Sequence, residues 1–332
     1  MKRLLIVILA AALLWCGYWF VGAQGARTAF AGWFDARRAD GWQADYSDLS
    51  VRGFPNRFDT TFTDLALADP DTGWMWQAPF FQLLALSYKP TSVIAVFPPE
   101  SQLATPQGTM ALATPDLRAS LSLSPAPRLP LDRARLVGTD LRVAGAGETL
   151  DLTTLRLAAE RLPAAEAGYH LGALVQGMDM PDALLARLGQ RVALPEAMDS
   201  LRIDADVTFD RPWDLDAIER ARPQPRRIAL RLAEAAWGPL GLAATGELTV
   251  DPQGVPTGTL SLKAENWRDM LRLAVAAGAL GQGMAATAER GLGLIANLSG
   301  RPDTLNVSLE FRDGGTFLGP VPLGPAPRLI LR

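Results

Sequence analysis

A run of twenty uncharged residues, from Leu4 to Ala23, lies near the start of the chain and constrains how all that follows can be interpreted. As an α-helix this run would rise about 30 Å, which matches the hydrocarbon core of a bilayer. Lys2 and Arg3 precede the run, so the positive-inside rule predicts that its N-terminal end faces the cytoplasm. The rest of the chain is then expected on the far side of a membrane.

This apolar run fits two roles, a retained anchor or a cleaved signal. Residues 21–23 are small, as a signal peptidase site requires. Bulky aromatic residues crowd the outer end of the run, namely Trp15, Tyr18, Trp19 and Phe20. Such rings suit a membrane interface better than a cleavage site, and the run is longer than a usual signal core. The sequence therefore favours a retained anchor and leaves cleavage as the alternative.

The stretch that follows the anchor, residues 26–40, has helical spacing. Phe30, Trp33 and Phe34 fall at positions i, i+3 and i+4, which places them on one side of a helix. This pattern predicts a helix that continues from the membrane or lies along its surface, or equally one that packs on the following domain. The residues predicted to contact the membrane are Trp15, Trp19, Phe30 and Trp33.

Composition limits the chemistry of the remaining chain. The 332 residues are 48% hydrophobic and 20% charged, which is enough apolar material for a large core. A net charge of −3 argues against a nucleic-acid binder. The single cysteine, Cys16, lies inside the apolar run, so no disulfide is expected beyond it. The 30 glycines and 25 prolines favour many short strands and turns over long helices.

Alternation of apolar and polar residues with a period of two is the dominant pattern. In residues 200–210, apolar side chains at the odd positions alternate with polar ones at the even positions. The same alternation recurs at 117–123, 228–232 and 304–312. Because strands buried on one face read this way, the pattern predicts antiparallel sheet. The fold class predicted is mainly β (α+β): an N-terminal transmembrane helix followed by an antiparallel β-meander that forms a curved sheet or groove, with a few covering helices.

Helical segments and domain limits follow from the places where the alternation lapses. Helices are predicted over 181–189, over 214–222 with Asp214 as the N-cap, from Asn266 onward, and over 284–298. Three parts are expected: residues 1–40 as anchor and juxtamembrane helix, residues 41–165 as a first β-rich half, and residues 166–332 as a second β-rich half with inserted helices.

Chemical motifs are weak. Asp204 and Asp206 lie two apart on a predicted strand, so their carboxylates would sit about 6–7 Å apart on one face, within reach of acid–base chemistry. Arg202 accompanies them on the polar face, which favours a solvated surface over an active site. The single histidine, His170, has no Cys, Asp or second His at metal-ligand spacing. The sequence therefore predicts no catalytic residues, no metal and no cofactor.

Three stretches carry a family resemblance: residues 51–55 with 88–90 and 97–98, residues 236–254, and residues 313–327. The pattern resembles a family of uncharacterised Gram-negative envelope proteins, known as a domain of unknown function. More distantly, the anchor, the Gly-Phe-Pro turn and the repeated hairpins resemble AsmA-like proteins. That resemblance implies a curved sheet with an apolar groove and a part in moving phospholipid between two membranes.

The function expected is non-enzymatic: an inner-membrane-anchored, single-pass protein with its bulk in the periplasm, which binds or helps to move lipid. Its partners would be the bilayer and a phospholipid or acyl chain, with no nucleic acid; protein partners are not indicated. The alternative is a structural or assembly factor with a closed β core, and a hydrolase ranks third. The residues predicted to contact the ligand are Leu201, Ile203, Val207, Phe209, Leu305, Val307, Leu309 and Phe311.

Overall fold

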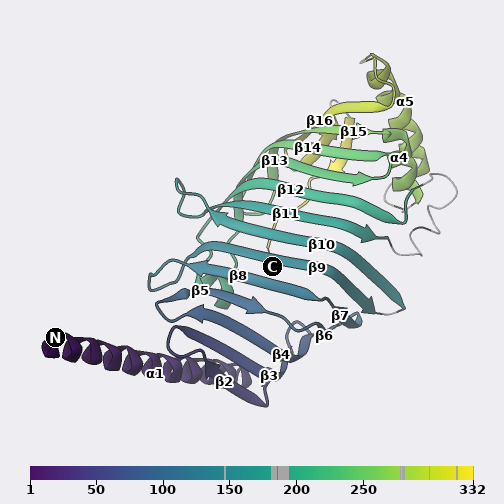
Figure 1. Cartoon of the computed structure of the whole chain (residues 1–332). Coiled ribbons are helices and arrows are strands. Elements are labelled where there is room, and N and C mark those ends of the chain that lie inside the picture. The colour runs from purple at the N-terminus through teal and green to yellow at the C-terminus, as the bar shows by residue number, and fades with distance from the viewer. Residues whose placement is uncertain are drawn as a thin grey trace. The chain divides into compact units, whose positions relative to one another are not determined.

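The computed structural model describes residues 1–145, 147–180, 185, 194–276, 278, 281–298, 300–318 and 321–331 (Figure 1). The protein is mainly β, with 55% strand and 21% helix, and its strands form a large antiparallel sheet after an N-terminal apolar helix. The predicted fold class is confirmed in these respects. Two compact units make up the chain: unit 1 comprises Met1–Pro125 and Ala134–Thr149, and unit 2 comprises Ala126–Arg133 and Leu150–Arg332.

The chain passes from one unit to the other within long strands. Strand β9 (Leu131–Gly145) contributes to both units, and β10 (Glu148–Arg161) belongs mostly to unit 2. The boundary predicted from the sequence, between residues 165 and 166, stays a prediction. Residues 162–167 form a short turn between β10 and β11 (Gly168–Asp179), in which the amide of Leu162 donates to the carbonyl oxygen of Gly168. The lapse of alternation there marks a turn.

Helix α1 (Lys2–Ala39) is one continuous helix. It is long and apolar enough to span a membrane. Its N-terminal half extends beyond the strands of unit 1 (Figure 1), and every residue from 4 to 14 is exposed. Its C-terminal half packs on β1 (Gln43–Asp45), β2 (Asp48–Arg52) and β3 (Arg57–Asp69), which the sequence analysis had offered as one of its alternatives.

Antiparallel pairing builds the unit 1 sheet outward from β3, which pairs with β1 and β2 on one side and with β4 on the other. Strand β4 carries β5 along its C-terminal half and β6 along its N-terminal half. Beyond these, β5 pairs with β8, β6 with β7, and β7 with β9. The bounds are β4 Trp74–Leu86, β5 Lys89–Val96, β6 Glu100–Thr105, β7 Gly108–Ala113 and β8 Asp116–Leu123.

A line of irregular positions, here called the crease, runs across this sheet. Asp64 of β3 adopts a left-handed backbone (φ 48°) and faces Pro79 of β4, which has no amide proton to donate. Prolines 98–99 separate β5 from β6, Pro115 separates β7 from β8, and Asp140 of β9 is again left-handed (φ 45°). The breaks within β3, β4 and β9 and the breaks between β5 and β6 and between β7 and β8 therefore lie at matching levels across the sheet.

The apolar residues of β3 change parity at Thr63–Asp64, a pattern typical of a β-bulge. No extra residue is inserted: Thr63 pairs with Phe80 and Leu65 with Ala78, so the register is the same on both sides. The change of parity arises from the left-handed backbone at Asp64.

Unit 2 is a plain meander in which each strand from β10 to β18 pairs with the next. The strand bounds after β11 are β12 Ala197–Phe209, β13 Pro225–Trp237, β14 Leu240–Val250, β15 Pro256–Glu265, β16 Thr304–Arg312, β17 Gly315–Leu318 and β18 Val321–Pro325. Asp313 and Gly314 form a two-residue turn with positive φ at both positions, as the tightest hairpins require.

Three described helices interrupt the meander: α3 (Leu215–Glu219), α4 (Trp267–Ala276) and α5 (Gln282–Leu298). Asp214 caps α3 as predicted, accepting from the amide of Ala217 at 3.1 Å. Asn266 precedes α4, but its side-chain amide donates to the carbonyl oxygen of Pro239 instead of capping the helix. The predicted helix over 181–189 lies almost wholly outside the described residues.

Candidate functional site

The strand register of unit 2 places apolar side chains on one face, here called the apolar face of unit 2. One cross-strand row joins Ile203 to Ala233, Ala244, Leu262 and Val307 through directly paired residues. The neighbouring rows contain further apolar members, namely Leu201, Ala205, Val207, Ile228, Leu230, Ala235, Leu242, Leu248, Leu260, Ala264, Leu305, Leu309 and Phe311. The residues that the sequence singled out on β12 and β16 thus share this face, with Phe209 at its end.

Exposure divides the apolar face of unit 2 into closed ends and an open middle. Val207 and Leu305, near opposite ends, are 6% and 5% exposed. Ile203 and Leu242, between them, are 39% and 41% exposed. The alternation in the sequence could not distinguish these two situations, because it reports which face a side chain occupies and not what covers that face.

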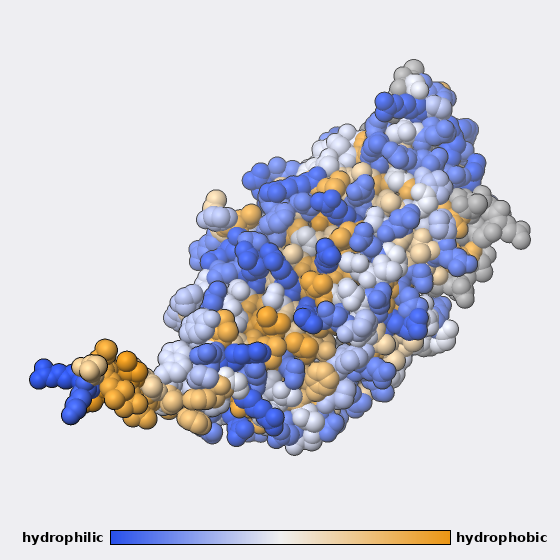
Figure 2. Space-filling model, in the orientation of Figure 1, coloured by the Kyte–Doolittle hydropathy of each residue, from blue (hydrophilic) through white to orange (hydrophobic). Residues whose placement is uncertain are grey.

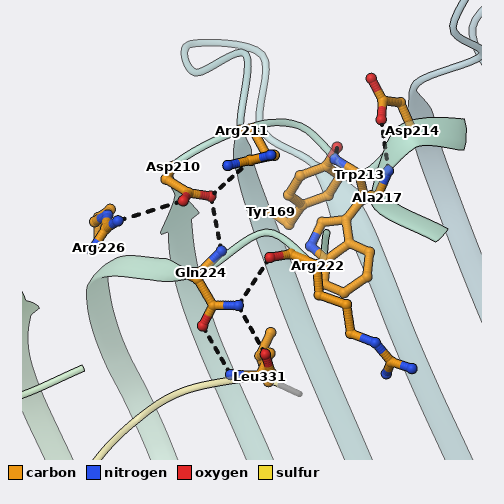
Figure 3. Close-up of polar contacts among 10 residues, drawn as sticks. All are labelled: Tyr169, Asp210, Arg211, Trp213, Asp214, Ala217, Arg222, Gln224, Arg226 and Leu331. Carbon is orange, nitrogen blue, oxygen red and sulfur yellow. Dashed lines mark hydrogen bonds and ion pairs between the residues drawn. The ribbon is translucent and has the colours of Figure 1, made fainter. Parts of the chain in front are cut away.

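The segment between β12 and β13 closes the first end (Figure 3). Phe209 packs between Tyr169 and Trp213, with ring centroids 6.0 and 5.7 Å away, and the amide of Trp213 donates to the Tyr169 hydroxyl at 3.1 Å. Burial raises the pKa of Tyr169, although the hydrogen bond from Trp213 opposes that shift. The Tyr169 phenol is therefore a neutral, structural group that helps to close this end.

The last described residues of the chain also hold this end of unit 2. Residues 326–331, here called the C-terminal strap, are fixed at three connections between strands. Ala326 donates to Gly314 and Leu329 to Gly254, each at 2.8 Å between amide nitrogen and carbonyl oxygen. At the third connection, Gln224 holds Leu331 (Figure 3). No sequence pattern predicted the C-terminal strap.

Helices α4 and α5 close the second end of the apolar face of unit 2. Trp267 of α4 is 2% exposed and packs with Leu292 and Ala296 of α5 against Ala264 and Leu305 of the sheet. The indole nitrogen of Trp267 donates to the carbonyl oxygen of Pro302 at 3.0 Å. The two helices therefore cover the β15–β16 corner of the face and leave Leu242 exposed.

Unit 1 has an apolar face of its own, here called the apolar face of unit 1. On the side covered by α1, Phe62 and Leu65 are each 3% exposed. Farther from α1, apolar residues on this face are only partly buried, namely Phe81, Leu83, Val93, Ala95 and Phe97, and Leu121 is exposed. Figure 2 shows hydrophobic residues gathered over this part of the sheet and on the projecting end of α1.

A groove of about 630 Å³ lies along the crease of unit 1. Small or apolar residues of four strands line it, including Leu65 and Ala66 of β3, Ala78 of β4 and Leu112 of β7. Its polar lining includes Asp64, Gln77, Glu100, Ser101 and Gln102. The volume lies within the usual range of small-ligand sites.

The polar face of unit 2 brings together residues that are far apart in sequence. His170 lies beside two carboxylates, with Nδ1 2.9 Å from Oδ1 of Asp206 and 3.8 Å from Oδ1 of Asp204. The guanidinium of Arg231 contacts the other oxygen of Asp206 at 2.5 Å. The sequence showed no partner for His170 at metal-ligand spacing, and it is the β11–β12 register that pairs His170 with Asp206.

The electrostatics of this cluster favour a fixed carboxylate over a proton shuttle. Burial alone would raise the pKa of Asp206, but hydrogen bonds from His170 and Arg231, together with their charge, outweigh it and hold the pKa below its usual value. Arg231 thus neutralises Asp206, whereas the sequence indicated only Arg202 as a basic neighbour on the polar face. Among the described residues, no group of three or more His, Cys, Asp or Glu side chains is arranged to hold a metal ion.

The four residues expected to contact the membrane have different surroundings. Trp15 and Trp33 are 37% and 41% exposed, which leaves their rings accessible. Trp19 is 6% exposed and donates from Nε1 to the carbonyl oxygen of Arg57 at 2.7 Å, and Phe30 packs edge-on against Phe62 at 5.4 Å. For Trp19 the expectation needs correction, because its ring is buried against protein; Phe30 is partly buried, and its contact with the membrane stays a prediction.

The fold and these faces define a mainly β protein that carries an N-terminal helix able to span a membrane. Residues 19–327 match the model of a family described as an uncharacterised protein conserved in bacteria (DUF2125), and the chain belongs to that family. Comparisons with curated proteins and with solved structures gave no match. The distant likeness to AsmA-like proteins stays a prediction.

Proposed function

We propose that this protein is a non-enzymatic lipid-binding protein, anchored by α1 in the bacterial inner membrane with its sheet in the periplasm. The observation that carries the proposal is the open middle of the apolar face of unit 2. Ile203 and Leu242 stay about two-fifths exposed there, although residues at both ends of the same face are almost fully buried. A face built to be a closed core would leave no such strip.

The physical reason is the cost of apolar surface in water. Each Å² of apolar surface removed from water stabilises by about 25 cal/mol, so a strip of Leu, Ile and Ala side chains gains from any apolar cover. The row from Ile203 to Val307 crosses five strands without a charged side chain. An acyl chain can lie along such a row because it needs no hydrogen-bond partners.

Retention of α1 is supported by its contacts with unit 1. Trp19 donates a hydrogen bond to the carbonyl oxygen of Arg57, and Trp19 and Ala23 pack in a buried cluster with Phe58. Cleavage after Ala23 would remove Trp19 and uncover Phe58, on which it packs. Lys2 and Arg3 before the apolar run support the orientation with the sheet outside the cytoplasm.

A structural or assembly factor is the second candidate, and the closed ends favour it. Tyr169, Val207 and Phe209 form a packed cluster at one end, and α4 with α5 covers the other. In this reading the open middle has no ligand, and the sheet serves only to hold other surfaces in place.

Lipid that co-purifies with the full chain separates the two candidates. The wild type, Ile203→Glu, Leu242→Glu and the control Thr245→Glu are extracted in mild detergent, and bound lipid is quantified by mass spectrometry. Thr245 is exposed on the polar face of β14, three residues from Leu242, so the control adds the same charge on the other side of the sheet.

We expect phospholipid with the wild type and with Thr245→Glu, and a loss of at least fivefold in the two apolar-face variants, with all four proteins folded. Equal lipid in all four proteins, or none in the wild type, would contradict lipid binding at this face and support the assembly factor.

A further inference from the structure

The outer part of the apolar run of α1 is bound to two turns of unit 1. These turns, residues 53–56 between β2 and β3 and residues 87–88 between β4 and β5, are here called the turn pair. Trp15 Nε1 donates to the carbonyl oxygen of Pro55 at 3.1 Å, and the Tyr18 hydroxyl donates to that of Ser87 at 2.5 Å. With the hydrogen bond from Trp19 to Arg57, three aromatic side chains fix the turn pair beside α1.

The position of these contacts along α1 sets the depth of the turn pair. Trp15 and Trp19 lie about 17 and about 23 Å from Leu4 along a helix that rises 1.5 Å per residue. The hydrocarbon core of a bilayer is about 30 Å thick. If Leu4 enters that core from the cytoplasmic side, the turn pair lies beside the part of α1 that crosses the outer leaflet.

The part of α1 that stands clear of unit 1 cannot span a bilayer alone. Residues 4–14 are all exposed, but these eleven residues rise only about 17 Å. A spanning α1 must therefore carry its contacts with unit 1 into the membrane.

The turn pair has the chemistry of an inserting surface. Phe54 is 50% exposed, Tyr88 is 65% exposed, and Leu86 next to the second turn is 39% exposed. Phe54 also stacks on Phe20 of α1, with ring centroids 5.8 Å apart, so the exposed apolar surface is continuous with the helix.

Basic residues predominate around the turn pair. Arg52, Arg57 and Lys89 flank the two turns; Arg57 is engaged by Asp59, with 3.0 Å between Nε and Oδ1, so Arg52 and Lys89 are the basic groups that face outward for a headgroup. An apolar tip with flanking basic residues suits the boundary between acyl chains and anionic headgroups.

We propose that the turn pair is a membrane-inserted wedge, in which Phe54, Leu86 and Tyr88 enter the outer leaflet of the bilayer that α1 spans and Arg52 and Lys89 contact lipid phosphates. This inference rests on the proposed anchoring by α1. It places the β3–β5 end of the unit 1 sheet at the lipid surface.

Depth-dependent fluorescence tests the wedge. Full-length chain with Cys16→Ser as background receives a single cysteine at Phe54, Tyr88 or Leu13, or at Asp71 as the control. Asp71 is exposed in the turn at the opposite end of β3 and β4. Each variant is labelled with an environment-sensitive dye and reconstituted into phosphatidylcholine–phosphatidylglycerol vesicles with or without doxyl-labelled acyl chains, and circular dichroism confirms that it is folded.

We expect labels at Phe54→Cys and Tyr88→Cys to show blue-shifted emission, at least twofold quenching by doxyl chains and little quenching by aqueous iodide. The label at Asp71→Cys should behave in the opposite way. The wedge is overturned if the Phe54 and Tyr88 labels match the Asp71 label while the Leu13→Cys label is quenched by doxyl chains. If the Leu13 label also reports water, the anchor itself fails, and the wedge fails with it.

Discussion

The side-chain amide of Gln224 makes two hydrogen bonds with the main chain of Leu331, 107 residues further along the chain. Nε2 donates to the carbonyl oxygen of Leu331 and Oε1 accepts from its amide, both at 2.9 Å. The same Nε2 donates to the carbonyl oxygen of Arg222, so Gln224 joins the C-terminal strap to the segment that closes one end of the apolar face of unit 2.

Loss of this clamp should release the end of the chain. For Gln224→Ala we expect a decrease of about 1–2 kcal/mol in the free energy of unfolding, because three partly solvated hydrogen bonds are lost. Hydrogen exchange at the amides of Leu329 and Leu331 should accelerate at least tenfold. Gln253→Ala, at an exposed glutamine in the turn next to the strap, serves as the control. Unchanged exchange at Leu331 would show that the strap is held without Gln224.

A carboxylate at Val207 should unfold unit 2, unlike one at Ile203. Val207 is buried in the cluster with Tyr169, so Val207→Glu places an unpaired charge in a closed region and should cost more than about 3 kcal/mol. Ile203→Glu can reach water and should cost about 1 kcal/mol or less. Thermal melts of both variants check this, and equal losses of stability would mean that the middle of the face is closed too.

Gly246 should not tolerate even a methyl group. It lies in the row between Leu230 and Leu260 with φ +154°, and an added Cβ would lie 2.2 Å from the carbonyl oxygen of Thr259. Gly246→Ala should therefore lower the free energy of unfolding by more than 1 kcal/mol.

The matched control for Gly246 is Gly172→Ala on β11, where the new Cβ would meet only the Cβ of Ala158 at 3.9 Å. Urea unfolding of both variants provides the measurement. If Gly172→Ala proves as harmful as Gly246→Ala, the close approach of the strands is not the cause.

The cluster around Asp206 should make stability depend on pH in the acid range. Its pKa in the folded chain lies below the value of an unfolded Asp, about 3.9, so its contribution is fully present above that value and is lost as the pH falls through the lower, folded pKa. Asp206→Asn should therefore be less stable than the wild type by about 1 kcal/mol at pH 7, given the partial exposure of the group.

The difference between Asp206→Asn and the wild type should shrink as the pH falls below about 3.9. Denaturant unfolding of both proteins between pH 2.5 and 7 measures it, with Asp71→Asn as an exposed control. A difference that stays constant over the whole range would argue against a charged Asp206 as the cause.

Alternation and turn chemistry predicted most strands of unit 2, because every strand there pairs with its neighbour in sequence. Pairings such as β5 with β8 in unit 1 could not be predicted, because a period-two pattern shows which face of the sheet a side chain occupies but not which strand lies next to it. The contact between His170 and Asp206, which are 36 residues apart in sequence, depends on the register of β11 against β12 and could not be predicted either. The prediction that Trp19 contacts the membrane was wrong because a tryptophan suits a membrane interface and a protein surface with a free carbonyl oxygen equally well, so the sequence does not distinguish the two.

The order of strand pairing has a consequence for how the chain folds. In unit 2 each new hairpin adds to an edge already formed, so loop closure is short at every step and the sheet can grow one strand at a time. The unit 1 sheet cannot be completed until β8 and β9 have been made, because β8 pairs with β5 and β9 pairs with β7. The first part of the chain to be made is thus completed by strands that follow it, and until then β5 and β7 are open edges that a chaperone could recognise.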